Sequence, residues 1–184
     1  VIIDTFGLVG MTARKLTLAR ALGAGLAAVG LVLANYQPDV KLSWLVLLPL
    51  VAGFGIGFQQ ALNGGIGKAA GSPLLATLIN FAVGVLFIGV VLALTMGSEL
   101  TPSWPTNPLL YLGGAIGVAF IFTQVVVVRI IGVLSMAIAI LFGQLAGSLL
   151  LEIFLPLPGQ QLEITGILAI ALVGLGALLV IRKR

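Results

Sequence analysis

The sequence predicts an all-α bundle of membrane-spanning helices, and three observations carry this prediction. Of the 184 residues, 60% are hydrophobic and only 8% are charged, against about 25% charged residues in soluble domains. Nine Lys and Arg with five Asp and Glu cannot cover the surface of a soluble protein of this size. Apolar segments of about 20 residues, the length that crosses a bilayer core, recur along the chain. We therefore expect most of the surface to face the lipid bilayer.

Charged residues, prolines and glycines divide the chain into six expected spans. These run approximately from Leu16 to Tyr36, Ser43 to Leu62, Pro73 to Met96, Leu109 to Val128, Val133 to Phe154, and Leu162 to Ile181. The intervening segments contain residues that favour turns, such as Asn63-Gly64-Gly65 and Pro156-Leu157-Pro158-Gly159. The sequence thus predicts a polytopic bundle with six spans.

The basic residues indicate how this bundle is oriented. If the spans alternate through the membrane, Lys41 lies on one side and all the other Lys and Arg lie on the opposite side. The latter are Arg14, Lys15, Arg20, Lys68, Arg129, Arg182, Lys183 and Arg184. The positive-inside rule places this basic side, and with it the C-terminus, in the cytoplasm. Because these residues are scattered at helix ends, we expect no nucleic-acid partner.

The absence of Cys and His from the sequence narrows the possible functions. Without these residues the chain has no thiolate or imidazole metal ligand, no Cys nucleophile and no His general base. No Walker A motif is present, so ATP hydrolysis by this chain is not expected. We therefore expect no enzymatic activity, no cofactor and no metal site.

Two parts of the sequence match weakly, and their charges suggest an inverted repeat. The stretch Ile2–Phe6 aligns with Leu150–Phe154, and Leu16-Thr17 aligns with Ile164-Thr165 at the same separation. The turn in the first copy carries Arg14 and Lys15, whereas its counterpart carries Glu163. Equivalent loops are therefore expected on opposite sides of the membrane, as in transporters built from inverted repeats.

The repeat predicts a domain organisation. A unit with an odd number of helices inverts when it is duplicated in tandem, and five spans follow residue 42. Residues 43–184 are then a complete second five-helix repeat, residues 37–42 an external linker, and residues 1–36 the tail of the first repeat. This organisation is part of a ten-helix, 5+5 transporter fold, and it requires a missing upstream repeat or a second subunit.

Several motifs resemble a known family. They are Gln59–Lys68, Gly71–Leu74, Asn80–Gly84, Tyr111–Gly117 and Gly143–Ser148. In this order they resemble the YdcZ-like family of inner-membrane exporters, which belongs to the drug/metabolite transporter (DMT) superfamily. The resemblance covers residues 43 to 182. It implies a bacterial inner-membrane transporter with ten helices in two repeats.

Polar side chains in the fifth span are the first candidates for a transport pathway. Gln144, Ser148 and Glu152 recur every fourth residue and share one helical face, with Gln144 near the middle of the span. A polar group in hydrocarbon costs free energy unless it is partnered, so such groups mark pathways. Alternatively, Gln144 forms an ordinary hydrogen bond to another helix.

Four other amides are further candidates. Gln59 and Asn63 share a face of the second span, Asn80 lies in the third span, and Gln124 lies in the fourth. Each amide can donate and accept hydrogen bonds, which suits contact with a polar solute. Packing between helices or helix capping is the alternative for all four.

Two carboxylates are candidates for coupling or gating. Glu152 lies toward the end of its helix, and Asp4 is its equivalent in the other repeat, on the opposite side. Carboxylates at the two mouths of a pathway suit proton coupling or cation gating. Alternatively, either carboxylate sits in headgroup water without such a role.

From these features we expect a secondary active exporter of small metabolites or drug-like solutes, which works by alternating access between inverted repeats. Its partners are a small-molecule solute and the lipid bilayer. The alternative is a non-transporting membrane subunit, in which the polar and small residues bind neighbouring proteins.

Overall fold

The computed structural model describes residues 1–34, 47–96, 104–155 and 164–182, and every regular element in these ranges is helical. A short α1 (Ile2–Phe6) and a 3-10 turn, η1 (Leu8–Gly10), come first. The long helices are α2 (Leu18–Ala34), α3 (Leu47–Ala69), α4 (Pro73–Met96), α5 (Leu112–Ile131), α6 (Val133–Phe154) and α7 (Ile164–Arg182), and a second 3-10 turn, η4 (Pro108–Tyr111), leads into α5. The all-helical prediction is confirmed for the described residues, and α4 and α6 have the predicted bounds.

Four helical segments in the described part of the chain are long and apolar enough to cross a membrane. They are Pro73–Thr95, Pro108–Ile131, Val133–Phe154 and Ile164–Ile181. The described part of α2 is apolar but has only 17 residues, and α3 has 23 residues but includes Gln59, Gln60 and Asn63. The six-span prediction therefore stays a prediction for α2 and α3.

The predicted turn at Asn63-Gly64-Gly65 is wrong, because α3 continues as a helix through these residues to Ala69. Both glycines permit close packing. A Cβ atom on Gly64 would lie 2.9 Å from Val128 Cγ1, and one on Gly65 would collide with the Val9 carbonyl oxygen. The actual turn follows α3, where Gly71 adopts φ +64 before α4 begins. The glycines of the predicted turn thus serve helix packing.

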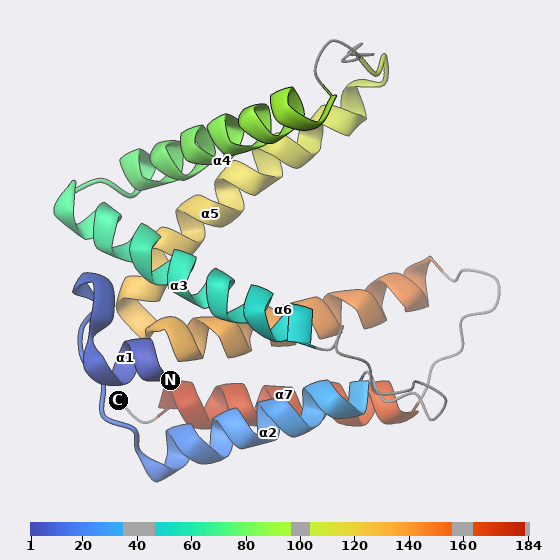
Figure 1. Cartoon of the computed structure of the whole chain (residues 1–184). Coiled ribbons are helices and arrows are strands. Elements are labelled where there is room, and N and C mark those ends of the chain that lie inside the picture. Colours follow the sequence, from blue (N-terminus) through green and yellow to red (C-terminus); the bar gives the residue numbers. More distant parts are fainter. Residues whose placement is uncertain (35–46, 97–103, 156–163, 183–184) are drawn as a thin grey trace.

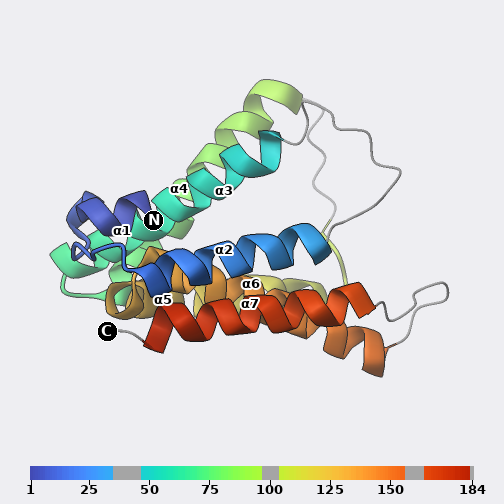
Figure 2. The same ribbon diagram turned by 90° about the horizontal axis from the view of Figure 1, so that it is seen from below.

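Figures 1 and 2 show α2 and α7 side by side, with α6 next to them, whereas α4 diverges from these three helices. Two clusters of buried apolar side chains hold the bundle together. The first core consists of Ile3, Met11, Ala61, Val128, Val133 and Met136. The second core consists of Ala27, Leu134, Ile138, Val173, Ala177 and Val180. Since α6 contributes to both cores, it links the α1, α3 and α5 side of the bundle to the α2 and α7 side.

Glycines allow α2 and α7 to pack closely as an antiparallel pair. A Cβ atom on Gly23 would lie 2.5 Å from Val180 Cγ2, and one on Gly30 would lie 2.7 Å from Val173 Cγ2. Two apolar helices in lipid gain no hydrophobic free energy by associating, so close backbone approach through small residues is what holds such pairs together. The contact runs along α2 from its second turn to its last turns.

A buried carboxylate fixes the start of α6. Asp4 is only 1% exposed, and its Oδ1 and Oδ2 accept hydrogen bonds from the backbone amides of Val133 (2.8 Å) and Leu134 (3.0 Å). Arg20 Nη2 lies 2.5 Å from Asp4 Oδ2 and supplies the counter-charge. Amides at a helix N-terminus carry partial positive charge, so a carboxylate is favourable there. We call Asp4, Arg20 and these two amides the Asp4 joint.

The backbone around the Asp4 joint leaves no room for a larger residue before α6. Gly132 adopts φ +87, a conformation that side chains disfavour. A Cβ atom there would lie 2.9 Å from Asp4 Oδ2 and 3.0 Å from Arg14 Nε. Arg14 also closes the end of α5, because its Nη2 donates to the Ile130 carbonyl oxygen at 2.8 Å. The N-terminal segment is thereby tied to the α5–α6 corner.

Replacing Asp4 by Ala should lower the free energy of unfolding by about 3–5 kcal/mol, because the Arg20 guanidinium is left buried without its counter-charge. Thermal unfolding of the purified protein in detergent measures this change as a lower Tm. Combining Asp4→Ala with Arg20→Ala should cost less than the sum of the two single changes, since each single change leaves one group unpaired. Strictly additive losses would contradict a buried, coupled pair.

Replacing Gly30 by Ala should destabilise the protein by about 1–3 kcal/mol, because the added methyl group must push α7 away. The matched control is Gly25→Ala in the same helix, where a Cβ atom meets nothing within 4 Å. Thermal unfolding of both variants should show a lower Tm for Gly30→Ala only. A similar Tm for the two variants would contradict the close α2–α7 contact.

Candidate functional site

Three of the predicted site residues meet between α3 and α4. Gln59 Nε2 and Asn63 Nδ2 both donate to Asn80 Oδ1, at 2.9 Å and 3.0 Å. Asn63 is buried, Asn80 is half-buried and Gln59 is exposed. Residues four apart on α3 thus converge on one acceptor of α4. We call these three residues the α3–α4 amide cluster.

The short connection between the two helices brings these amides together. Gly67 lies at this end of α3, where a Cβ atom would be in ordinary contact with Ala76 Cβ of α4 (3.6 Å) but would collide with Val125 Cγ1 of α5 (2.7 Å). Thr77 is buried one turn into α4, and its hydroxyl donates to the Pro73 carbonyl oxygen at 2.9 Å. With α3 and α4 held closely at this end, Asn80 lies level with Asn63.

The α3–α4 amide cluster keeps unused hydrogen-bonding groups. Asn80 Oδ1 accepts two bonds, which fills its capacity, but Asn80 Nδ2 donates none within the described residues. The carbonyl oxygens of Gln59 and Asn63 likewise accept none there. The arrangement therefore holds the two helices together and still offers one NH2 group and two carbonyl oxygens.

Two more glutamines are buried beside the first core. Gln124 on α5 is 6% exposed, and no hydrogen bond in the described ranges joins it to the α3–α4 amide cluster. Gln60 on α3 is 5% exposed, and its Oε1 is buried without a hydrogen-bond partner among the described residues. Sequence reasoning did not select Gln60, although it adjoins Gln59 in the same motif. Its burial follows from tertiary packing, which the motif does not show.

The polar residues of α6 lie on an open face. Gln144 and Ser148 are exposed and Glu152 is half-buried, and no hydrogen bond joins any of them to another described residue. Gln144 follows Ile140 by four residues and Leu141 by three, so it lies next to both on the helix surface. We call Gln144, Ser148 and Glu152 the α6 polar stripe.

The α6 polar stripe lies along the boundary between two packed faces of the helix. Ile140 packs against the first core, which includes residues of α3. Leu141 packs against the second core, which includes residues of α2 and α7. The stripe thus begins between the surface of α6 that faces the first core and the surface that faces the second core.

The structure does not bring the α6 polar stripe and the α3–α4 amide cluster together within this chain. Ala61 of α3 packs in the first core with Val133 and Met136 of α6. Gln59 and Asn63 lie two residues before and after Ala61, which places them on the opposite side of α3. The amide cluster consequently faces α4, whereas the stripe lies on the other side of the α3 helix.

The two candidate acids lie at opposite ends of α6. Asp4 is bonded to the first two residues of that helix, and Glu152 is close to its end at Phe154. Asp4 is buried in the Asp4 joint, whereas Glu152 is half-buried. A coupling or gating role for either acid stays a prediction.

Sequence reasoning missed the pairing of Asp4 with Arg20 and treated Arg20 only as an orientation signal. One sequence signal pointed to this pair. Arg20 is the only Lys or Arg that lies within any of the six expected spans. A buried cation in such a place needs a partner. Within the described residues, no group of three or more His, Cys, Asp or Glu side chains could hold a metal ion.

The comparisons with known proteins identify the family. The family model described as "Putative inner membrane exporter, YdcZ" matches residues 44–179. The searches of curated proteins and of solved structures gave no match. The matched segment contains the α3–α4 amide cluster, the α6 polar stripe, three of the apolar helices that can cross a membrane and most of the fourth, Ile164–Ile181. Because the match covers most of the chain, this protein belongs to the YdcZ family of inner-membrane exporters.

Proposed function

We propose that this multi-pass inner-membrane protein is a secondary active exporter of small metabolites or drug-like solutes. The observation that carries the proposal is the α6 polar stripe. Gln144 lies near the middle of the 22-residue, apolar α6 and is exposed without a hydrogen-bond partner in the described part of the chain. An unpartnered amide at this depth is costly in lipid, so it is retained where it meets water or a polar solute.

The same face of α6 has room for a second helical surface. Gly143 and Gly147 lie next to the α6 polar stripe, and a Cβ atom on either meets nothing within 4 Å. Small residues at four-residue spacing allow another helix to approach closely. We propose that the first repeat, or a second subunit, faces α6 here and encloses the solute pathway between the two surfaces.

The antiparallel pairing of α2 with α7 supports an inverted-repeat organisation. In this proposal residues 1–36 end the first repeat, residues 37–42 link the repeats, and residues 43–184 form the second repeat. The two helices that end the repeats then pack against each other with opposite directions, as inversion requires. All six long helices span the membrane in a ten-helix fold, and the C-terminus is cytoplasmic because the basic residues lie on that side.

The α3–α4 amide cluster has a different role in this proposal. Its two hydrogen bonds fix α3 against α4, on the side of α3 away from the stripe. The solute is contacted by Gln144 and Ser148, and Glu152 lies at the mouth of the pathway, where a carboxylate suits proton coupling or the recognition of cations.

Replacing Gln144 by Leu should reduce transport of an identified solute at least about tenfold, because the near-isosteric side chain removes both the donor and the acceptor. Uptake into inverted membrane vesicles at matched protein levels measures the effect. The control is Thr123→Val, which removes an exposed hydroxyl that already donates to the Ala119 carbonyl oxygen of its own helix. Unchanged transport and KM in Gln144→Leu would favour the non-transporting or purely structural alternatives.

Replacing Asn80 by Leu should lower the Tm, with a loss of about 1–2 kcal/mol of stability, because Gln59 and Asn63 lose their common acceptor. The KM of transport should stay unchanged if the cluster only fixes the helices. Thermal unfolding and vesicle uptake on the same preparation separate the two effects. A raised KM without a lower Tm would show instead that these amides contact the solute.

A further inference from the structure

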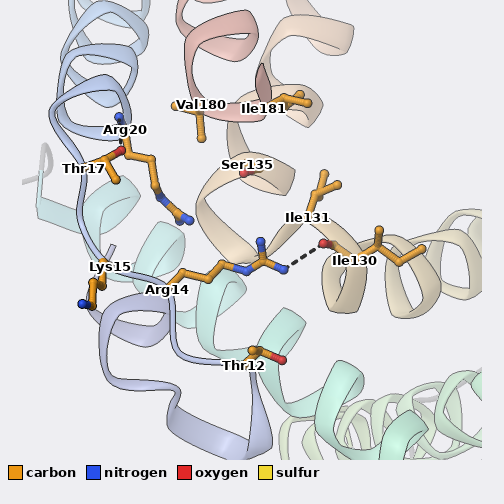
Figure 3. A pocket seen from close by; sticks show the side chains of 10 residues that line it. All are labelled: Thr12, Arg14, Lys15, Thr17, Arg20, Ile130, Ile131, Ser135, Val180 and Ile181. Atoms are coloured by element: carbon orange, nitrogen blue, oxygen red, sulfur yellow. Dashed lines mark hydrogen bonds between the residues drawn. The ribbon is translucent and has the colours of Figure 1, made fainter. Parts of the chain in front are cut away.

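The basic end of the bundle contains a pocket with an accessible volume of about 400 Å³. It lies where α2 begins, where α7 ends and where α5 turns into α6 (Figure 3). Its polar lining consists of Thr12, Arg14, Lys15, Thr17, Arg20 and Ser135. Figure 3 shows the guanidinium groups of Arg14 and Arg20 directed toward the space in front of Ser135. The pocket is therefore lined by cationic groups and hydroxyls from segments far apart in the sequence.

The lining carries an excess of positive charge. The charge of Arg20 is balanced by Asp4, but the Arg14 side chain donates only to the uncharged Ile130 carbonyl oxygen within the described residues. Lys15 is exposed at the pocket, and no described residue forms an ion pair with it. The other carboxylate in the described ranges, Glu152, lies at the far end of α6. Within the described residues neither Arg14 nor Lys15 consequently forms an ion pair, and the single Asp4 carboxylate close to Arg14 and Arg20 leaves the lining with a net positive charge.

Hydroxyl groups add neutral donors to these cations. The Ser135 side chain is 2% exposed, and its hydroxyl forms no hydrogen bond with another described residue. The Thr12 hydroxyl is likewise without such a bond, whereas Thr17 Oγ1 accepts from the Arg20 amide at 3.3 Å. Because Ser135 lines the pocket, its hydroxyl is free to donate a hydrogen bond to a ligand that accepts one.

A second basic pocket adjoins the first. Thr12 and Ile130 line both pockets, and the second one, also of about 400 Å³, includes Lys68 and Arg129. No carboxylate lines either pocket among the described residues. The electrostatic potential of the first pocket is thus reinforced by its neighbour.

We propose that the first pocket binds a phosphate group, carried either by an anionic phospholipid at the headgroup level or by a soluble phosphate ion. A phosphate presents several strong acceptor oxygens and negative charge, which match the guanidinium of Arg14, the ammonium of Lys15 and the hydroxyl of Ser135. Basic pockets between helices at a membrane surface suit such headgroups. This site lies apart from the α6 polar stripe, and its occupation does not depend on the proposed transport function.

The test compares binding of lipids and of phosphate to the purified, delipidated protein in a non-ionic detergent. Native mass spectrometry measures retention of phosphatidylglycerol against phosphatidylcholine with the same acyl chains. The thermal shift with inorganic phosphate, against chloride at equal ionic strength, measures binding of the free ion. We expect a preference for phosphatidylglycerol if the phosphate comes from lipid, and a phosphate-specific rise in Tm if it comes from solution.

Three variants locate the bound group. Lys15→Gln should weaken binding about fivefold, whereas the control Lys41→Gln, in the proposed 37–42 linker, should leave it unchanged. Ser135→Ala keeps every charge and should still weaken binding about threefold, because it removes a hydroxyl inside the pocket. Equal binding by Lys15→Gln and Lys41→Gln would overturn the proposal. So would a wild-type protein that neither prefers phosphatidylglycerol nor responds to phosphate.

Discussion

The structure depends on the buried carboxylate of Asp4. This one side chain satisfies the first two amides of α6 and neutralises the buried guanidinium of Arg20. Removing a carboxylate and a guanidinium from water costs several kcal/mol each, and their attraction repays this only when further hydrogen bonds complete the geometry. The two α6 amides, the positive φ at Gly132 and the contact of Arg14 with Ile130 supply that geometry. The start of α6 is consequently fixed to the segment that precedes α2.

With its start fixed, α6 becomes the element around which the other helices are arranged. One face packs with α3 and α5 in the first core, and another packs with α2 and α7 in the second. Most helix surface nevertheless remains open, since only 11% of the most apolar stretch of α4 and 28% of that of α7 are buried within the chain. In a membrane such surfaces meet lipid or other helices, and close contacts form where glycines permit them. The polar groups of α6 lie on one of these open surfaces.

Much of the fold could be predicted from the sequence, and the errors have physical causes. The bounds of α4 and α6 were predictable because Pro73 and Gly132 mark their starts and apolar residues continue from there. The turn predicted at Gly64 and Gly65 was wrong because glycines, which often end helices in soluble proteins, serve as packing sites in this apolar helix. Part of the candidate site was also predictable, since the spacing of Gln59 and Asn63 places them on one face. Their shared acceptor, the burial of Gln60 and the Asp4 joint depend on how distant segments pack, which periodicity does not encode.

The central claim is that the α6 polar stripe borders a water-accessible path and not lipid. Because the chain contains no Cys, single-cysteine labelling tests this directly. Gln144→Cys and, as a lipid-facing reference, Val85→Cys on the exposed surface of α4 are each treated in membranes with a membrane-impermeant thiol reagent. The account predicts that position 144 reacts, that a transported solute slows the reaction, and that position 85 stays unlabelled. A position 144 as unreactive as position 85 would contradict it.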